Sequence, residues 1–240
     1  MAVKAERQKS ELIDLVATRV RDRLESAQGQ SAERFLRAFY AHVPPDDILD
    51  EDPDNLYGAA LALWDHGQQR RAGKCKVRVY TPRPGEHGWK SSHTIVEIIN
   101  DDMPFLVDSV TAGLDGLEVE VYLVIHPIIH VERDAKGKLT GLREPGVQPN
   151  QAAGESFMHI QISEQPGERH AEISKAIEGV LEDVRASVED WRPMRERLRE
   201  IVTQLKTSPP PLPEAEIAEG VAFLEWMDDN NFTYLGYREY

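Results

Sequence analysis

The sequence predicts an α+β protein in which a helical N-terminal unit precedes a ferredoxin-like βαββαβ sandwich with an antiparallel sheet. Three observations lead to this fold class. Through residues 1–72, apolar residues recur every three or four positions, which is the period of amphipathic helices. The following segment then runs strand, helix, strand, strand, helix. Its second strand begins a nearly continuous apolar run at Val119, as expected for a strand buried on both faces.

Residues 1–72 form the predicted helical unit. Amphipathic helices are expected over 8–27, 31–43 and 55–70, each with its apolar side chains gathered on one side. The intervening segment 44–54 is acidic and contains prolines, so a loop is expected there.

Residues 73–206 form the predicted α+β domain. Strands are expected over 77–80, 93–100, 119–126, 128–132, 138–142 and 156–163, and helices over 103–117, 168–189 and 191–205. A mobile loop is expected over 143–154. The final strand of the βαββαβ order has no counterpart downstream, and 77–80 could supply it as an edge strand. Along 156–163 the alternation places Phe157, His159 and Gln161 on one face and Met158, Ile160 and Ile162 on the other.

A proline-rich linker is predicted over 207–216, because three consecutive prolines favour an extended, semi-rigid spacer. Residues 217–240 are predicted to open a following domain, with a helix over 217–227 and a strand over 232–240. One helix and one strand cannot close a core of their own. We therefore expect the sequence to be a piece of a longer protein.

The composition argues against several classes of partner. The chain of 240 residues has 28 Lys and Arg against 42 Asp and Glu, a net charge of −14, and no extended basic stripe. The best basic cluster is the short set Arg70, Arg71, Lys74 and Lys76. We therefore expect neither a nucleic-acid partner nor a membrane partner. The chain has no long apolar run, no secretory signal pattern and a single cysteine, Cys75, which together predict a cytoplasmic protein.

The candidate ligand-binding residues lie where a predicted strand ends and an apolar helix begins: Asn100, Asp101, Asp102, Met103, Pro104 and Phe105. A helix N-terminus offers unpaired backbone N–H groups and a positive dipole end, which suit a carboxylate. The structural alternative is that Asp101 or Asp102 merely caps the helix.

A metal site is the weaker chemical alternative. Its possible ligands are Asp101, Asp102, Asp108, His126, His130 and His159, and a small metal-dependent hydrolase could use Asp101 and the three histidines. Their spacing matches no known metal motif, and we expect the histidines to hydrogen-bond within or beside the sheet. Cys75 lies between two lysines but has no histidine near it in sequence. Since GxSxG, GxGxxG and GxxxxGK[ST] are also absent, we predict no catalytic residue, metal or cofactor in this chain.

Several stretches nevertheless resemble a known family. INDDMPFLVDS (99–109), VIHPIIHVERD (124–134) and SFMHIQI (156–162) resemble the N-terminal region of the large NAD-specific glutamate dehydrogenases of bacteria. WDHGQQRRAGKCKVRVYTP (64–82) and FLEWMDDNNFTYLGYREY (223–240) are similar to flanking parts of that region. The resemblance implies a long cytoplasmic polypeptide that uses NAD to deaminate L-glutamate oxidatively to 2-oxoglutarate. Its catalytic domain would lie far downstream, so this chain alone should be inactive.

The resemblance also implies that residues 73–206 are an ACT-like regulatory domain. ACT domains commonly show Asp-x-Pro-Gly between a strand and a helix, near an amino-acid ligand. Here Asp102, Met103 and Pro104 match, whereas Phe105 stands where glycine is usual, and its ring would fill space near a ligand. This departure favours a role in packing or assembly over binding of an amino-acid effector. A free-standing amino-acid sensor is the alternative function, and the expected partners are the remaining domains of the same polypeptide and further copies in a homo-oligomer.

Overall fold

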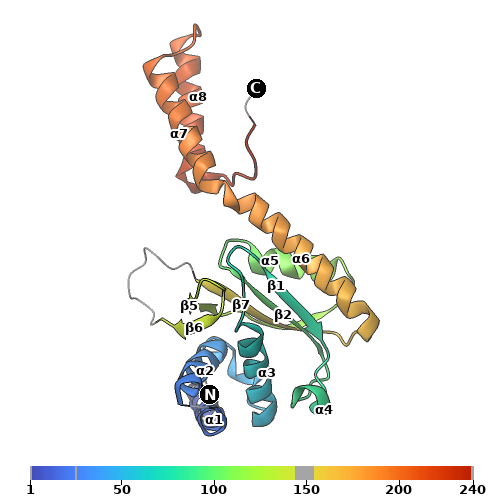
Figure 1. Cartoon of the computed structure of the whole chain (residues 1–240). Coiled ribbons are helices and arrows are strands. Elements are labelled where there is room, and N and C mark those ends of the chain that lie inside the picture. Colours follow the sequence, from blue (N-terminus) through green and yellow to red (C-terminus); the bar gives the residue numbers. More distant parts are fainter. Residues whose placement is uncertain (1, 25, 144–153, 239–240) are drawn as a thin grey trace. The chain divides into compact units, whose positions relative to one another are not determined.

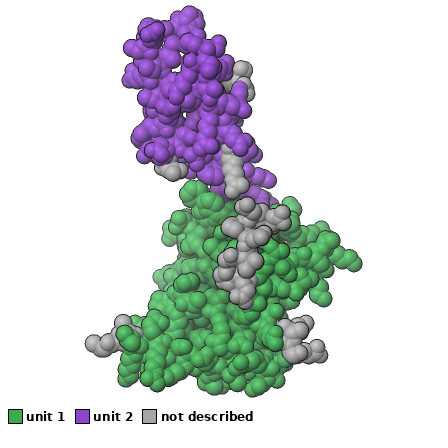
Figure 2. All heavy atoms as spheres, turned by 90° about the vertical axis from the view of Figure 1, so that its left-hand side faces the viewer, with its two compact units in different colours: residues 1–181 green, residues 182–240 purple. Residues whose placement is uncertain are grey.

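The computed structural model describes residues 2–24, 26–143 and 154–238. Most of the predicted mobile loop, 144–153, and the last two residues of the predicted strand 232–240 therefore lie outside the described residues. The chain divides into two compact units, residues 1–181 and 182–240, which Figure 2 shows in different colours.

Three helices and a short 3-10 turn begin the first unit (Figure 1): α1 (Ala2–Arg23), α2 (Ser26–Tyr40), η1 (Pro45–Asp47) and α3 (Pro53–His66). The three predicted helices are confirmed in type and order. The break between the first two lies at residues 24–25, a few residues before the predicted break. Helix α3 starts where its sequence favours a start, because the carboxylate of Asp52 accepts a hydrogen bond from the backbone N–H of Asp54 at 2.8 Å.

Four strands form the path of the main sheet in the order β1-β2-β7-β3, and all of these neighbours are antiparallel. They are β1 (Lys76–Tyr80), β2 (Thr94–Asp101), β3 (Val121–Ile125) and β7 (Glu155–Ile162). The two-residue strand β4 (Ile128–Ile129) also pairs with β7. This is the ferredoxin-like strand order, and β1 occupies the edge that the missing last strand would take. The predicted α+β class and the edge position of 77–80 are thus confirmed.

The remaining elements of the first unit connect these strands. They are α4 (Pro84–His87), α5 (Leu106–Asp115), α6 (Gly167–Glu189) and the hairpin formed by β5 (Val131–Arg133) and β6 (Leu139–Leu142). Helices α5 and α6 pack closely, since a Cβ added at Gly113 would lie 2.8 Å from a methyl carbon of Val180. Figure 1 shows these two helices on one face of the sheet and α1–α3 on the other.

The predicted alternation along β7 is confirmed by its contacts. Phe157 packs edge-on against Phe35 of α2, with ring centroids 5.2 Å apart, and His159 meets Phe39 at 5.6 Å. Both side chains therefore face the N-terminal helices, and Met158 and Ile160 lie buried on the opposite face. A single sheet carries a core on each side.

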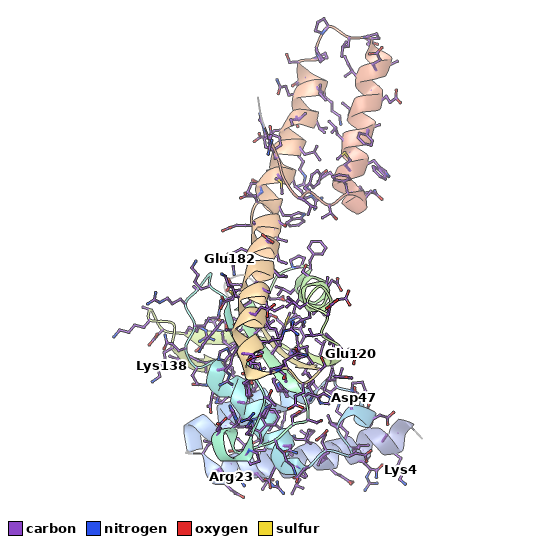
Figure 3. All side chains as sticks on the ribbon, turned by 90° about the vertical axis from the view of Figure 1, so that its right-hand side faces the viewer. Lys4, Arg23, Asp47, Glu120, Lys138 and Glu182 are labelled. Carbon is purple, nitrogen blue, oxygen red and sulfur yellow. The ribbon has the colours of Figure 1, made fainter. Side chains whose placement is uncertain are left out.

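The second unit contains α7 (Trp191–Thr207), α8 (Glu214–Trp226) and a π-helical turn, η2 (Met227–Asn231). Figures 1 and 3 both show α7 and α8 side by side, joined by the proline-rich stretch. Asp228 holds this unit together by accepting from Arg195 at 2.6 Å and from Arg199 at 2.8 Å. Residues 232–238 have no regular secondary structure, so the predicted strand is wrong over these residues. The division at 73–206, 207–216 and 217–240 stays a prediction.

Candidate functional site

The loop that we predicted as a ligand site lies between β2 and α5. Strand β2 ends at Asp101 and α5 begins at Leu106, three residues later than the predicted start of this helix. Asn100 is buried at 1% exposure, whereas Phe105 is 46% exposed. The six predicted residues therefore run from the core of the sheet to the surface.

Phe105 explains the late start of the helix. It is the N-cap of α5 and has φ 68° and ψ 4°, a left-handed conformation that favours glycine and that costs other residues about 1–2 kcal/mol. No side chain caps the helix, so the predicted capping by Asp101 or Asp102 is wrong. Phe105, at the position where the ACT pattern has glycine, thus adopts a backbone conformation that favours glycine.

Asp101 does not cap the helix because an arginine engages it. The guanidinium of Arg70 donates to the Asp101 carboxylate at 2.6 Å and to the Glu155 carboxylate at 2.8 Å. Glu155 lies at the start of β7 and also receives two hydrogen bonds from Arg133, at 2.7 and 2.8 Å. We call Arg70, Asp101, Arg133 and Glu155 the arginine–carboxylate cluster.

The cluster is buried and its charges balance. The side chain of Arg70 is 4% exposed and that of Glu155 is 7% exposed. Burial by itself would raise the pKa of Glu155, but hydrogen bonds from Arg133 and Arg70 outweigh burial and lower the pKa below its ordinary value. Glu155 is therefore ionised in the folded protein at neutral pH. The cluster joins the segment after α3, the end of β2 and the hairpin strand β5 to the start of β7.

The backbone supports the cluster at one close approach. The carbonyl of Gly137, in the β5–β6 turn, accepts from the Arg70 backbone N–H and from the Arg133 guanidinium, both at 2.9 Å. Gly137 has φ 83°, and a Cβ there would collide with the carbonyl oxygen of Arg70. Only glycine combines this positive φ with the space that the close approach of the Arg70 carbonyl requires.

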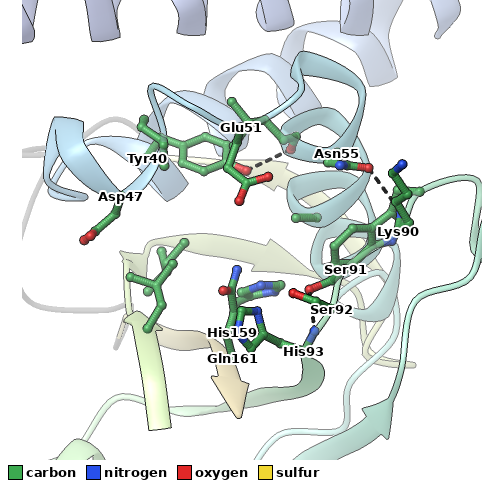
Figure 4. Close-up of a pocket in the computed structure, with 16 residues that line it drawn as sticks. Tyr40, Asp47, Glu51, Asn55, Lys90, Ser91, Ser92, His93, His159 and Gln161 are labelled. Carbon is green, nitrogen blue, oxygen red and sulfur yellow. Dashed lines mark hydrogen bonds between the residues drawn. The ribbon is translucent and has the colours of Figure 1, made fainter. Parts of the chain in front are cut away.

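A second polar feature is a cavity of about 340 Å³ between the N-terminal helices and the sheet, drawn in Figure 4. Residues of η1, of α3 and of the stretch between them line one side, and β3 and β7 line the other. Figure 4 shows His159 and Gln161 rising from β7 toward the cavity, with Glu51 and Tyr40 on the helical side. No pattern in the sequence predicted this cavity.

His159 is the most unusual residue of the cavity. Its side chain is completely buried, and neither ring nitrogen has a hydrogen-bond partner among the described residues. Burial, and after it the positive charge of Arg78, lowers the pKa of His159 to about 3. The imidazole is therefore neutral near pH 7 and offers one N–H donor and one acceptor. Our expectation that it hydrogen-bonds within the sheet is wrong.

The register partner of His159 on β2 is Glu97, which is fully buried. The Glu97 carboxylate accepts from Arg78 Nε at 3.0 Å and from the Tyr80 hydroxyl at 2.8 Å. Burial is the main reason that its pKa is raised, and the Arg78 charge opposes that rise. Arg78 is thus engaged by Glu97.

The other candidate metal ligands are not brought together. His126 is half-buried and shares a 2.5 Å hydrogen bond with the Ser156 hydroxyl, as expected for a histidine beside the sheet, while His130 is exposed. Asp108 lies in the first turn of α5, and Cys75 is partly exposed. Over the residues that the structure describes, no group of three or more His, Cys, Asp or Glu side chains could hold a metal ion.

Sequence reasoning missed the partners in both polar features. It placed Arg70 in a short basic cluster with Arg71, Lys74 and Lys76, whereas Arg70 is 5% exposed and paired with carboxylates. Glu97, a lone acid within the apolar strand HTIVEIIN, was a usable sign of a buried polar network. Nothing in sequence spacing indicated that Arg133 and Glu155 would meet, because their contact depends on the β5–β6 hairpin. Among the described residues, no helix is long and apolar enough to cross a membrane.

The strand order, the left-handed turn before α5 and the two helices on one face define an ACT-like α+β domain. Comparison with known proteins agrees: the family model "Glutamate dehydrogenase, ACT1 domain" matches residues 35–177, and the chain belongs to this family. The chain is 35% identical over 241 residues to the NAD-specific glutamate dehydrogenase of Halomonas elongata, covering 99% of this chain and 15% of that protein. It is also 35% identical over 208 residues to the NAD-specific glutamate dehydrogenase of Pseudomonas aeruginosa, covering 86% of this chain and 13% of the relative.

Proposed function

We propose that this chain is a non-catalytic regulatory or assembly segment of a large NAD-dependent glutamate dehydrogenase. The whole protein would convert L-glutamate, NAD and water to 2-oxoglutarate, ammonium and NADH. The chain spans only 15% and 13% of the two relatives, so most of such a protein would lie outside it. The remaining domains of the polypeptide would bind NAD and glutamate, and copies of the whole protein would form a homo-oligomer.

The observation that carries this proposal is the turn before α5. Phe105 keeps the left-handed backbone of an ACT-type loop, on a sheet with the ferredoxin-like order, inside the region that the ACT1 family model matches. Such domains resemble regulatory modules rather than dinucleotide-binding domains. The sequence contains no GxGxxG, which a dinucleotide site of the usual kind would require.

Glutamate-dependent formation of NADH tests the proposal directly. We expect the pure 240-residue chain to show none, while the whole enzyme of the same source turns over. Circular dichroism of the chain must show that it is folded in the assay. Turnover by the folded chain would overturn the non-catalytic assignment.

An amino-acid effector at residues 100–105 is the second candidate function, either within the enzyme or in a free-standing sensor. It is favoured by the uncapped start of α5, where Phe105 leaves the first N–H groups of the helix without a side-chain acceptor. Against it, the Asp101 carboxylate is engaged by Arg70. Calorimetric titration of the chain with the common amino acids tests it. Heat that disappears in a Pro104→Ala, Phe105→Ala double variant would support a site in this loop, and no heat would leave packing or assembly as its role.

A further inference from the structure

The second unit exposes more apolar surface than its small core explains. Among the described residues, twelve large apolar side chains are exposed, and seven of them lie within residues 182–240. In the described part of this unit four apolar side chains are buried: Val184, Met194, Leu198 and Val221. Exposed apolar side chains that gather in one small region mark an interaction surface.

Helix α8 carries two of these side chains next to each other. Phe223 is 58% exposed and Trp226 is 52% exposed, and their rings stack with centroids 6.0 Å apart. From the spacing along the helix, both project from the side opposite the buried Val221. A helix that is apolar on opposite sides needs a partner on each side, and α7 is the helix that packs against α8. We call Phe223 and Trp226 the aromatic surface.

The surroundings of the aromatic surface are acidic. Glu219 lies one turn before Phe223, Asp229 lies three residues after Trp226, and both acidic side chains are exposed. Residues 208–237 contain six acidic residues and no Lys or Arg. Since charges across an interface are complementary, the partner should present apolar side chains flanked by Lys or Arg.

A second copy of the same surface does not supply this chemistry. A two-fold contact between copies would place the acidic surroundings against themselves, and like charges across an interface are unfavourable. Three cations of the neighbouring helix α7 are already engaged inside the unit. Asp228 accepts from Arg195 and Arg199, and Glu225 accepts from Lys206.

More of the same polypeptide is the occupant that remains. The chain covers only 15% of the Halomonas elongata relative, so most of such a polypeptide lies outside residues 1–240. We propose that Phe223 and Trp226 dock a segment of the same polypeptide from outside residues 1–240, whose apolar side chains are flanked by Lys or Arg. This inference rests on the proposed function, because its occupant belongs to a longer polypeptide.

Photochemical cross-linking in the whole polypeptide of the same source tests which segment occupies the surface. Phe223 is replaced by the photoreactive p-benzoylphenylalanine, and Leu15 of α1, which is 48% exposed, is replaced likewise as the matched control. We expect position 223, and not position 15, to cross-link to a peptide from outside residues 1–240 that contains Lys or Arg, without a change of mass on a denaturing gel. A product of doubled mass, a cross-link within residues 1–240, or no cross-link would overturn the proposal.

Formation of NADH from glutamate by the same preparation is measured separately. A covered aromatic surface in a polypeptide without this activity would remove only the proposed function. An uncovered surface in an active enzyme would overturn only the docking of Phe223 and Trp226.

Hydrogen exchange of the α8 amides tests the aromatic and the acidic parts of the surface. Exchange should be slower in the whole polypeptide than in the 240-residue chain by about tenfold or more, because docking suppresses local opening of the helix. In the whole polypeptide, a Phe223→Ala, Trp226→Ala double variant should lose this protection, and so should Glu219→Lys, which reverses the charge. Leu15→Ala and Glu178→Lys, at exposed positions in other helices, should keep it. Equal exchange in the chain and in the whole polypeptide would overturn the proposal.

Discussion

Two buried polar side chains on the same face of strand β7 differ in whether they have hydrogen-bond partners. Glu155, at its start, accepts hydrogen bonds from Arg70 and Arg133 and belongs to a cluster whose charges balance. His159, four residues further along the same face, is equally inaccessible and has no partner among the described residues. Both side chains are buried. They therefore differ in whether they have hydrogen-bond partners and not in burial.

This difference teaches which buried polar groups hold the fold together and which lower its stability. A buried network whose charges are all paired fixes the positions of the elements that contribute to it, although the Nε of Arg70 has no hydrogen-bond partner among the described residues. A buried polar group without a partner lowers stability. We therefore interpret the arginine–carboxylate cluster as a network that fixes the elements of the fold, and His159 as a buried group that lowers stability.

The largest expected effect comes from breaking the charge-paired cluster at the start of β7. Arg70→Ala should reduce the free energy of unfolding by about 2–3 kcal/mol, because it removes the charged hydrogen bonds to Asp101 and Glu155 and leaves Glu155 with Arg133 alone. The control is Arg71→Ala, whose side chain is exposed and which should change stability by less than about 0.5 kcal/mol. Urea unfolding followed by circular dichroism measures both. Similar values for the two variants would remove the distinction between the cluster and the surface.

Acid should affect the unsatisfied imidazoles first. Burial, and after it Arg78, lowers the pKa of His159 and of His66 from 6.5 to about 3. Below pH 6.5 these two imidazoles therefore bind protons in the unfolded chain but not in the folded chain. Stability should fall by about 1.4 kcal/mol per pH unit for each histidine between about pH 6.5 and 3, and should show no such dependence above that window.

Urea unfolding between about pH 7 and 5 measures that slope, since the lowered pKa of Glu155 confines its effect to more acidic solutions. In His159→Leu the slope should fall by about 1.4 kcal/mol per pH unit, because only His66 and His126, whose pKa burial also lowers, then contribute. A slope that His159→Leu leaves unchanged would mean that this imidazole is protonated in the folded protein.

A smaller effect of opposite sign is expected when the unsatisfied group is removed. His159→Leu should raise the free energy of unfolding by about 1–2 kcal/mol at neutral pH. His126→Leu is the matched control, since His126 has a partner in Ser156 and its loss should lower stability by about 1 kcal/mol. If both substitutions destabilise alike, an unseen partner satisfies His159 and the contrast along β7 fails.

The smallest effect concerns the backbone strain at Phe105 and not a buried polar group. Phe105→Gly should stabilise the folded chain by about 0.5–1 kcal/mol, because relief of the left-handed strain exceeds the added flexibility of the unfolded chain. Thermal unfolding measures it, with Phe223→Gly in α8 as a control that should destabilise, since glycine is unfavourable inside a helix. A destabilised Phe105→Gly would show that the exposed ring contributes more by packing than its conformation costs.

Much of the fold followed from local pattern. The strands at 93–100 and 156–163 were placed within one residue of β2 and β7, because runs of β-branched and apolar residues with period two have few other solutions. The role of 77–80 as an edge strand followed from the known strand order. The start of α5 was misplaced because Phe105 adopts a conformation that its residue type disfavours. The expected strand at 232–240 was misread from aromatic and β-branched composition, which does not specify a pairing partner.

The sequence by itself determined the fold class, the faces of β7 and, through its resemblance, the family to which the chain belongs. These depend on periodicity and on motifs that lie close together in the chain. Only the tertiary structure decided that Arg70 is buried against Asp101 and Glu155, and that His159 lies beside a cavity without a partner. Arg70 and Glu155 are 85 positions apart, and whether a polar group is satisfied depends on what the folded chain brings within about 3 Å of it.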